Sequence, residues 1–436
     1  MRYPTLARLA AMAFALSLSA PASAQPTAFR GAEIIPISGP AIANGVLVID
    51  DGRIVAVGSE SDVSIPGDAQ TIDVSGKVIM PGLVDTHSHV GRVEGGDRSA
   101  PLHPGVRTLD AIDVRHSSVN RARAGGITTA NIMSGSGHLL SGQTTYVKLR
   151  DGGTLEELLI CENPLTDVCG GMKMANGTNS ISSNAPFPGT RAKSAALVRQ
   201  LFLDAQAYRQ EIADADDDEN EMPDRDLAKE ALVEVLEGRR IVQFHTHRHD
   251  DILTVLRLKD EFGFRVVLHH VSEGWKVADE IAAAGVPCSI IVIDSPGGKE
   301  EAVDLRYDTG AVLEHAGVDV AYHTDDYITD SRLFLRSAAF GVRAGMSREK
   351  ALEAVTLAGA RMLGLQDRVG SLEVGKDADF VILSGDPLSI YTKVDQTWVE
   401  GRMVFDLSDP EDAAFANGGY GVYDDGALYH DHGGPN

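Results

Sequence analysis

Residues 78–89 form an apolar run that ends in two alternate histidines, His87 and His89. If the run is a β-strand, side chains two positions apart project from the same face, so the two imidazoles converge on one point. Neutral imidazole nitrogens at such a point can hold a divalent metal ion such as zinc. Alternate histidines can equally be polar residues leaving a core, so the metal hypothesis depends on ligands at other strand ends.

Four later residues that can bind a metal follow apolar runs of the same kind: Lys173, His245, His270 and Asp325. Any one of them alone could be a satisfied polar residue of a core or a rim. Their recurrence at the same end of several predicted strands favours one shared site.

Lys173 has apolar neighbours, Met172 and Met174, on a presumed inner strand. Burial of a bare ammonium group there is costly. The lysine can stay neutral, or react with carbon dioxide to form a carbamate whose two oxygens bridge two metal ions. It can also extend to the rim or pair with a carboxylate.

Alternating strands and helices must position these residues. Strands are predicted at 127–133, 146–149, 171–175, 240–247, 264–270, 286–294 and 318–325, with helical patterns such as 192–212 and 252–262 between most of them. With the strand ending at His89 they number eight, which predicts an α/β chain with a (β/α)8 TIM-type barrel. Reactive groups then lie at the carboxyl ends of the strands.

Short β-type runs flank this region, with a hairpin signal at Asp51-Gly52, and β character returns at 370–383 and 397–405. They predict a small β-sandwich domain formed from both chain ends. The expected organisation is a signal peptide (1–24), the small domain (25–77 and 369–405), the barrel with the predicted metal site (78–368) and a polar tail (406–436) without helix or strand period.

The first residues have the pattern of a secretory signal: Arg2 and Arg8, an apolar stretch, and Ala22-Ser23-Ala24 before the expected cleavage. We therefore expect an exported protein, periplasmic in a Gram-negative source. In an oxidising compartment Cys161 and Cys169 could close a small loop, which leaves Cys288 free and buried.

The chain has 39 basic and 63 acidic residues and a formal net charge of −24. Such a surface repels phosphate backbones and anionic lipids, so we expect neither nucleic acid nor a membrane as partner, but a small-molecule substrate; homo-oligomerisation stays open. The acidic run at 214–221 lacks the glycine and distal glutamate of a calcium loop and is read as a solvated loop.

The whole mature chain resembles the amidohydrolase superfamily, nearest to its imidazolonepropionase-like exported members. The resemblance rests on residues 81–89, 171–175, His245, 270–276, 324–326 and 370–383. It implies that His87 and His89 hold one Zn²⁺, that His245 and His270 hold a second, and that carboxylated Lys173 bridges them. Asp325 would contact the first ion, take a proton from the attacking water and deliver it to the leaving amine.

Neighbouring residues compete for some of these roles. His247 shares the face of His245, whereas strand alternation is expected to turn His269 away from His270 and Asp326 away from Asp325. For substrate binding, His138 lies in a Gly/Ser-rich rim loop, which could also be a plain flexible loop. Arg248 could bind a substrate carboxylate or form a structural ion pair.

The leading hypothesis is a binuclear zinc hydrolase of an amide or peptide-like C–N bond in a small substrate, such as a dipeptide or an N-acyl amino acid. One alternative is a mononuclear hydrolase of a cyclic amide, with Lys173 unmodified and His270 touching the substrate. Another is a metal-containing binding protein without turnover, which would have no need of the proton shuttle assigned to Asp325.

Overall fold

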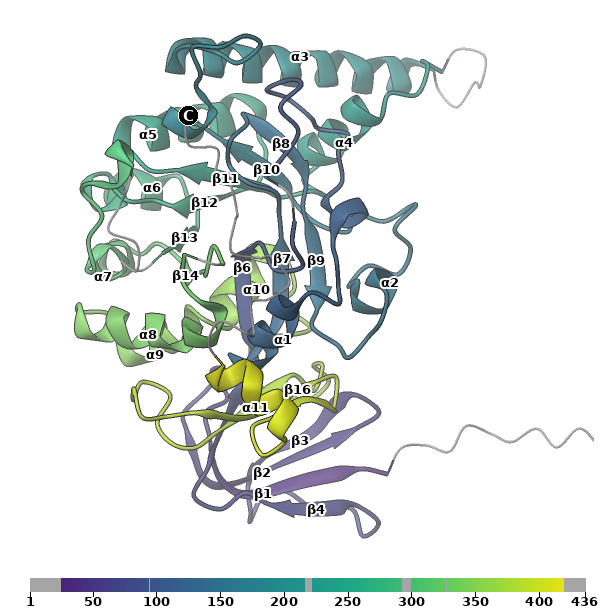
Figure 1. Cartoon of the computed structure of the whole chain (residues 1–436), viewed down its shortest axis with the longest axis vertical. Helices are drawn as coiled ribbons and strands as arrows, with labels where there is room; N and C mark the ends of the chain where they lie inside the picture. The colour runs from purple at the N-terminus through teal and green to yellow at the C-terminus, as the bar shows by residue number, and fades with distance from the viewer. Residues whose placement is uncertain (1–24, 94, 216–221, 292–298, 327, 419–436) are drawn as a thin grey trace, which may run out of the picture.

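The computed structural model describes residues 25–93, 95–215, 222–291, 299–326 and 328–418 (Figure 1). The predicted signal peptide, most of the acidic run and the residues after 418 lie outside the described residues. A small β domain lies at one end of the molecule, and a larger body of strands and helices lies above it.

The small domain draws its strands from both chain ends. Phe29 packs edge-on against Phe380 and Trp398, with ring centroids 5.1 Å apart in each case. Residues far apart in the sequence therefore share one apolar core. The strand order is β17-β16-β15-β5-β1-β2-β3, with β4 beside β1. The bounds are β1 Thr27–Ile34, β2 Ile42–Asp50, β3 Arg53–Ser59, β4 Gln70–Asp73, β5 Val78–Pro81, β15 Phe380–Leu383, β16 Val394–Val399 and β17 Arg402–Asp406.

The single strand predicted over residues 78–89 is wrong, because the run divides at Gly82. Its first part, β5, pairs with β1 and β15 in the small sheet, and its second part, β6 (Leu83–Ser88), pairs with β7 of the body. Gly82 donates its N–H to Asp379 O at 3.0 Å, and a Cβ at this position would collide with the side chain of Thr128. The close approach explains why residue 82 is a glycine. His87 lies in β6, and His89 directly follows its end.

The body contains two hydrogen-bonded sheets, ordered β6-β7-β9 and β14-β13-β12-β11-β10-β8. Strands β6 and β7 are parallel, as are β10 to β14, whereas β9 is antiparallel to β7 and β8 is antiparallel to β10. The bounds are β7 Ile127–Ile132, β8 Leu140–Gln143, β9 Thr145–Lys148, β10 Met172–Ala175, β11 Val242–Thr246, β12 Val266–His270, β13 Cys288–Ile290 and β14 Val320–Tyr322.

The strand predicted at 146–149 therefore exists as β9 but runs in the opposite direction, so its carboxyl end points away from the ends of its parallel neighbours. Beyond β14 the chain meets β6 through Asp325 N–H, which donates to His87 O at 2.9 Å. The fold is a TIM-barrel-like α/β arrangement. A closed ladder of eight parallel strands is not confirmed.

Helices cover the outer side of these strands (Figure 1). Helix α3 is the longest of the described helices, and its Phe202 stacks on Phe262 and Phe264 with ring centroids 5.1 and 5.2 Å away. No helix within the described ranges is long and apolar enough to cross a bilayer. The bounds are α1 Ser117–Ala124, α2 Leu155–Leu158, α3 Arg191–Asp214, α4 Leu227–Leu236, α5 His249–Phe262, α6 Ala278–Ala283, α7 Thr309–His315, α8 Phe334–Arg343, α9 Arg348–Glu353, α10 Leu357–Leu363 and α11 Pro410–Asn417. Short 3₁₀ turns occupy Thr108–Ala111, Gly177–Ser180, Gly274–Lys276, Glu300–Ala302 and Ser331–Leu333.

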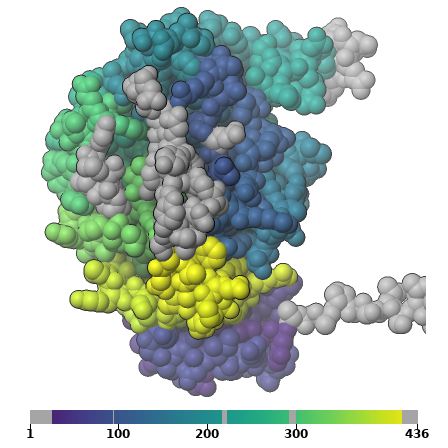
Figure 2. Space-filling view, viewed as in Figure 1, coloured from purple at the N-terminus to yellow at the C-terminus, as the bar shows by residue number. Residues whose placement is uncertain are grey.

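The expectation of an irregular tail from residue 406 is wrong for its first part, because Pro410–Asn417 forms α11. The Asp409 side chain accepts from the N–H groups of Glu411 and Asp412, and Pro410 occupies the first turn. Arg332 donates to the Gly418 carbonyl at 2.8 Å. The last described residues, up to 418 and yellow in Figure 2, lie where the small domain meets the body.

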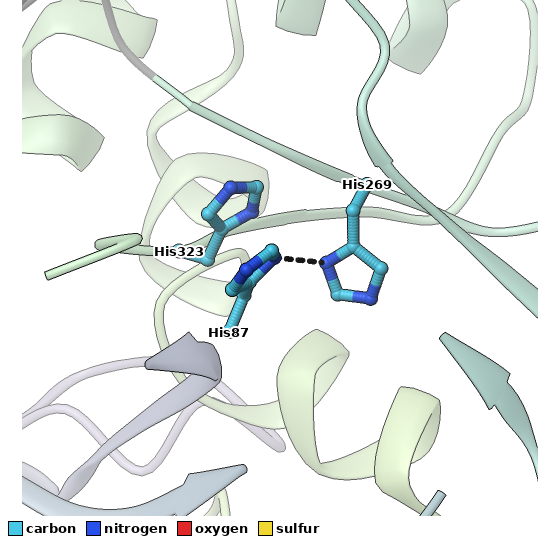
Figure 3. A group of neighbouring side chains, drawn as sticks. All are labelled: His87, His269 and His323. Carbon is cyan, nitrogen blue, oxygen red and sulfur yellow. Dashed lines mark hydrogen bonds between the residues drawn. The ribbon is translucent and has the colours of Figure 1, made fainter. Parts of the chain in front are cut away.

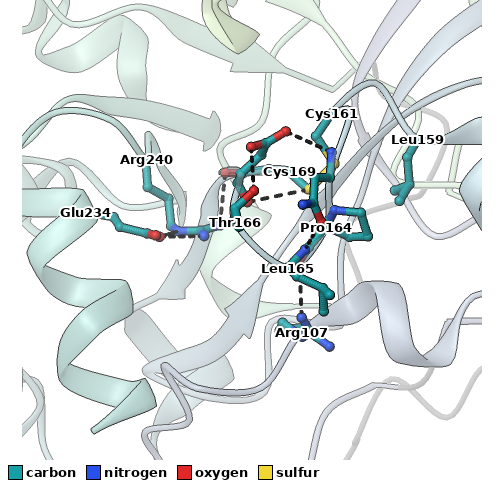
Figure 4. The surroundings of a disulfide bond; sticks show 12 residues. Arg107, Leu159, Cys161, Pro164, Leu165, Thr166, Cys169, Glu234 and Arg240 are labelled. Atoms are coloured by element: carbon teal, nitrogen blue, oxygen red, sulfur yellow. Dashed lines mark hydrogen bonds and ion pairs between the residues drawn. A yellow bond between two sulfur atoms is a disulfide. The ribbon is translucent and has the colours of Figure 1, made fainter. Parts of the chain in front are cut away.

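Cys161 and Cys169 are joined in a disulfide with Cα atoms 5.1 Å apart (Figure 4). Cys288 is free and buried. Both sequence-based expectations are confirmed. Arg240 fixes the end of the loop by donating to Gly170 O at 3.1 Å.

Candidate metal centre

The predicted ligands come together around the carboxyl ends of β6, β11, β12 and β14, and Lys173 joins them from within β10. His87 and Lys173 are fully buried, His245 and His270 are nearly so, and Asp325 keeps a side-chain exposure of 16%. This burial separates the group from bulk water, which strengthens electrostatic interactions inside it.

His87, His89 and Asp325 form a first cluster. Asp325 Oδ1 lies 2.9 Å from His89 Nε2 and 3.3 Å from His87 Nε2. The donor atoms of the three residues lie within 4.8 Å of one another, close enough to surround one metal ion. Asp325 reaches this position with a φ of 48°, in the left-handed region.

His245, His247 and His270 form a second cluster. The ring centroid of His245 lies 4.3 Å from that of His270 and 4.6 Å from that of His247. Neither ring nitrogen of His245 has a hydrogen-bond partner among the described residues, nor does Nε2 of His247 or His270. Buried imidazole nitrogens without partners suit a metal ion, because otherwise their desolvation is uncompensated.

In two of these histidines Nδ1 already has a hydrogen-bond partner outside the clusters, so Nε2 is the nitrogen that can bind a metal ion. His89 Nδ1 donates to Met133 O at 2.7 Å, and its Nε2 faces Asp325 Oδ1 at 2.9 Å. His247 Nδ1 hydrogen-bonds to Ser272 Oγ at 2.7 Å. An outer partner that fixes the ring and the nitrogen offered inward is typical of metal-binding histidines.

The expectation that His269 turns away from His270 is wrong. Their ring centroids lie 5.0 and 4.9 Å from that of His87. His270, with a φ of 70°, and Val271, with a φ of 51°, both adopt the left-handed conformation at the end of β12. Strand alternation therefore stops at this doublet, and both histidines face the centre.

His323 also belongs to the centre and was not singled out from the sequence. Its ring stacks on His87 with centroids 5.0 Å apart, and Figure 3 shows the rings of His87, His269 and His323 grouped together. His323 precedes Asp325 by two residues, so same-face alternation was the signal that could have identified it. Asp326 lies 3.9 Å from Arg121 and turns away from Asp325, as expected.

Electrostatics favour neutral imidazoles and an ionised aspartate. Burial lowers the pKa of His87, His245 and His270 well below the usual range and lowers that of His247 to about 3. Burial alone would raise the pKa of Asp325, but the hydrogen bond from His89 and the surrounding groups lower it well below its ordinary value. These are the protonation states in which histidine and aspartate bind metals.

Lys173 differs from the other predicted ligands because a lysine side chain is ordinarily a cation. Its Nζ lies 3.2 Å from His87 Nε2, and no carboxylate in the described part of the chain forms an ion pair with it. Burial lowers the pKa of Lys173 to about 7, so the neutral amine is accessible near neutral pH. The amine is the form that reacts with carbon dioxide.

The two predicted substrate residues lie at the rim. His138 is buried, with its ring centroid 5.3 Å from that of Phe187, and the next residue, Leu139, accepts a hydrogen bond from Ala175 N at the end of β10. Arg248 follows β11 and is paired with Asp250 at 2.9 Å. The structure therefore places Arg248 in an ion pair rather than in contact with the histidines.

Comparison with known proteins shows that this chain is similar to amidohydrolases and imidazolonepropionases. Residues 275–405 match the model of the amidohydrolase family. The amidohydrolase tasK of Hapsidospora irregularis is 27% identical over 83% of this chain, which spans only 40% of that protein's length. An imidazolonepropionase of Rhizobium rhizogenes is 26% identical over 81% of this chain and 88% of its own.

Among solved structures, an amidohydrolase from Thermotoga maritima is 31% identical. The match covers 87% of this chain and 100% of that chain, with a TM-score of 0.80. The similarity thus extends over both the small domain and the body.

Proposed function

Because the chain belongs to the amidohydrolase superfamily and is similar to imidazolonepropionases, hydrolases of C–N bonds, we propose that it is a metal-dependent hydrolase of an amide or peptide-like bond. The proposed substrate is small, such as a dipeptide or an N-acyl amino acid. The observation that carries the proposal is the position of Asp325, whose carboxylate lies within 3.3 Å of both His87 and His89.

The donor set suits zinc, which prefers imidazole and carboxylate ligands in proteins. His87, His89 and Asp325 would hold one ion, His245 and His270 a second, and Lys173, as a carbamate, would contribute an oxygen to each. Bound zinc lowers the pKa of water toward 7 and polarises a substrate carbonyl.

The chain's own residues would then handle the proton. Asp325 is ionised and lies in the water-poor centre, so its carboxylate can accept a proton from the attacking water and pass it to the leaving nitrogen. His138 and Arg248 would contact the substrate from the rim, Arg248 through a substrate carboxylate that competes with Asp250.

A mononuclear hydrolase of a cyclic amide is the second candidate, with Lys173 unmodified and His270 touching the substrate. It is supported by the donor distances, since His87, His89 and Asp325 form a complete metal-sized group by themselves. A binding protein without turnover gains no support from Asp325, because binding alone requires no proton shuttle.

Metal analysis combined with a substrate panel tests the proposal. Purified protein would be assayed against dipeptides, N-acyl amino acids and cyclic amides, as isolated, after removal of metal by a chelator, and after addition of zinc. We expect two zinc ions per chain and hydrolysis of linear substrates that is lost with the metal and restored by zinc. One zinc ion with activity confined to cyclic amides would favour the second candidate, and zinc binding without any turnover would contradict both.

We also propose that the protein is exported. The Cys161–Cys169 disulfide supports this, because disulfides persist mainly in oxidising compartments. Fractionation of cells expressing the full chain would place the protein outside the cytoplasm, and retention in the cytoplasm would contradict the proposal.

A further inference from the structure

His269 connects a predicted metal ligand to a fixed amide. His269 Nε2 lies 2.7 Å from Gln243 Oε1, and His269 Nδ1 lies 3.3 Å from His87 Nδ1 (Figure 3). Gln243 Nε2 makes a longer contact, donating to Tyr146 Oη at 3.4 Å on the other side of the amide. Because an amide oxygen can only accept, the proton of His269 must be on Nε2.

The position of that proton determines the tautomer of His87. A neutral His269 with its proton on Nε2 has a lone pair on Nδ1, so the contact between the two Nδ1 atoms requires a hydrogen on His87 Nδ1. His87 Nε2 is then left with its lone pair. This nitrogen lies 3.2 Å from Lys173 Nζ and 3.3 Å from Asp325 Oδ1, on the side of the proposed metal ions.

A second chain of hydrogen bonds supports His270 in the same way. His323 Nε2 lies 3.2 Å from His270 Nδ1, and His323 Nδ1 lies 2.8 Å from Ser289 Oγ. Ser289 in turn contacts Thr86 Oγ1 at 2.6 Å. Ser289 Oγ can accept a hydrogen bond from His323 Nδ1 while its own hydrogen is donated to Thr86 Oγ1. His323 Nε2 then accepts from His270 Nδ1, and His270 Nε2, which has no partner in the described chain, faces the centre.

We propose that His269, held by Gln243, and His323, held by Ser289, are positioning residues that fix which ring nitrogen His87 and His270 present to the metal centre. The proposal rests on the metal centre of the proposed function. The competing assignment makes His269 and His323 ligands, since donor atoms of His87, His269 and His323 also lie within 4.8 Å of one another. The hydrogen bond between His87 and His269 disfavours that assignment, because the same lone pair cannot bind both a proton and a metal ion.

Substitutions at Gln243 test the chain without touching a predicted ligand. Gln243→Leu removes the acceptor for His269, whereas Gln243→Glu keeps an acceptor oxygen. Tyr146→Phe is the matched control, because it removes only the outer contact of the amide. We expect zinc affinity, measured by competition with a coloured chelator, to fall about 10- to 100-fold in Gln243→Leu. Gln243→Glu and Tyr146→Phe should stay close to wild type.

Measurements at saturating metal concentration distinguish a positioning residue from a metal ligand. His269→Gln should bind zinc more weakly but bind the same number of ions at saturation, with the wild-type absorption spectrum when cobalt replaces zinc. Ser289→Ala and Ser289→Thr make the same comparison for His270, the threonine keeping the hydroxyl. Melting temperatures of the metal-free variants check that each is folded.

Unchanged zinc affinity in Gln243→Leu would overturn the inference. So would His269→Gln if it bound fewer ions at saturation or had an altered cobalt spectrum. Wild-type protein that binds zinc but hydrolyses nothing would contradict the proposed function and leave the positioning roles standing. Wild-type protein that binds no zinc would overturn both.

Discussion

Lys173 Nζ lies 3.2 Å from His87 Nε2 at a fully buried position. An ammonium there has no carboxylate partner in ion-pair distance among the described residues, so its charge is poorly compensated. Addition of the neutral amine to carbon dioxide forms a new N–C bond and releases a proton, which leaves an anionic carbamate. The change converts an unfavourable cation into a ligand for metal ions.

Replacement of this lysine tests whether it bridges two ions. Lys173→Ala should reduce bound zinc from two ions per chain to one, because the carbamate oxygens are lost. Native mass spectrometry of the wild type should show the added mass of one carbon dioxide, absent from the variant. An unmodified wild type with the same zinc content as Lys173→Ala would contradict the bridging role.

Asp325 should be required for turnover beyond its contribution to metal binding. In Asp325→Asn the amide keeps the shape of the side chain but cannot take up the proton, so we expect kcat to fall about 10²- to 10⁴-fold with zinc at saturation. Asp326→Asn is the control, because Asp326 faces Arg121 and not the centre. Equal losses in the two variants would show that Asp325 has no special role.

The buried Lys148 should hold the small domain to the body. Its Nζ lies 2.7 Å from Asp377 and 2.5 Å from Asp379, and all three side chains are almost fully buried. Lys148→Met would leave the buried Asp379 without its ion-pair partner, whereas Asp377 keeps Arg53 and Arg368. We expect the free energy of unfolding to fall by about 3–5 kcal/mol. Urea unfolding measures the change.

Lys77→Met is the matched control, because the Lys77 side chain is 42% exposed and pairs with Asp395. Its effect should remain within about 1 kcal/mol. Similar losses in Lys77→Met and Lys148→Met would contradict the importance of burial.

The disulfide should stabilise the loop that it closes. The bond joins residues eight positions apart, and its removal in the double variant Cys161→Ser/Cys169→Ser should lower stability by about 2–3 kcal/mol. A reducing agent should produce a similar loss in the wild type and none in the double variant. A reductant effect of equal size in both proteins would place the sensitivity elsewhere.

Glu273 should contribute a pH-dependent part of the stability. Burial alone would raise its pKa, but hydrogen bonds from Lys276 and His249 lower it to about 2. A depressed pKa stabilises the folded state above the unfolded value of about 4.3, and this contribution is lost as the pH falls from there to about 2. Glu273→Gln should flatten the stability curve in that window, whereas Glu237→Gln, at an exposed position, should not. Parallel curves for wild type and Glu273→Gln would refute the assignment.

Local patterns in the sequence were sufficient to predict part of the site. Alternation along β6 brings His87 and His89 to the same carboxylate, and same-face alternation relates His323 to Asp325. The apolar runs before His245 and His270 predicted their strands, β11 and β12. These features are visible in one chain because strand periodicity depends only on neighbouring residues.

Other features were decided only by the tertiary structure. The left-handed φ at His270 brings both histidines of the doublet to the centre, the reversal of β9 removes one strand end from it, and the contact at Gly82 divides the run at 78–89. Each depends on packing against residues distant in the sequence, which periodicity does not encode. The sequence by itself determined which side chains could bind a metal; the tertiary structure decided that His269 turns toward them, because long-range contacts set the backbone at the end of β12.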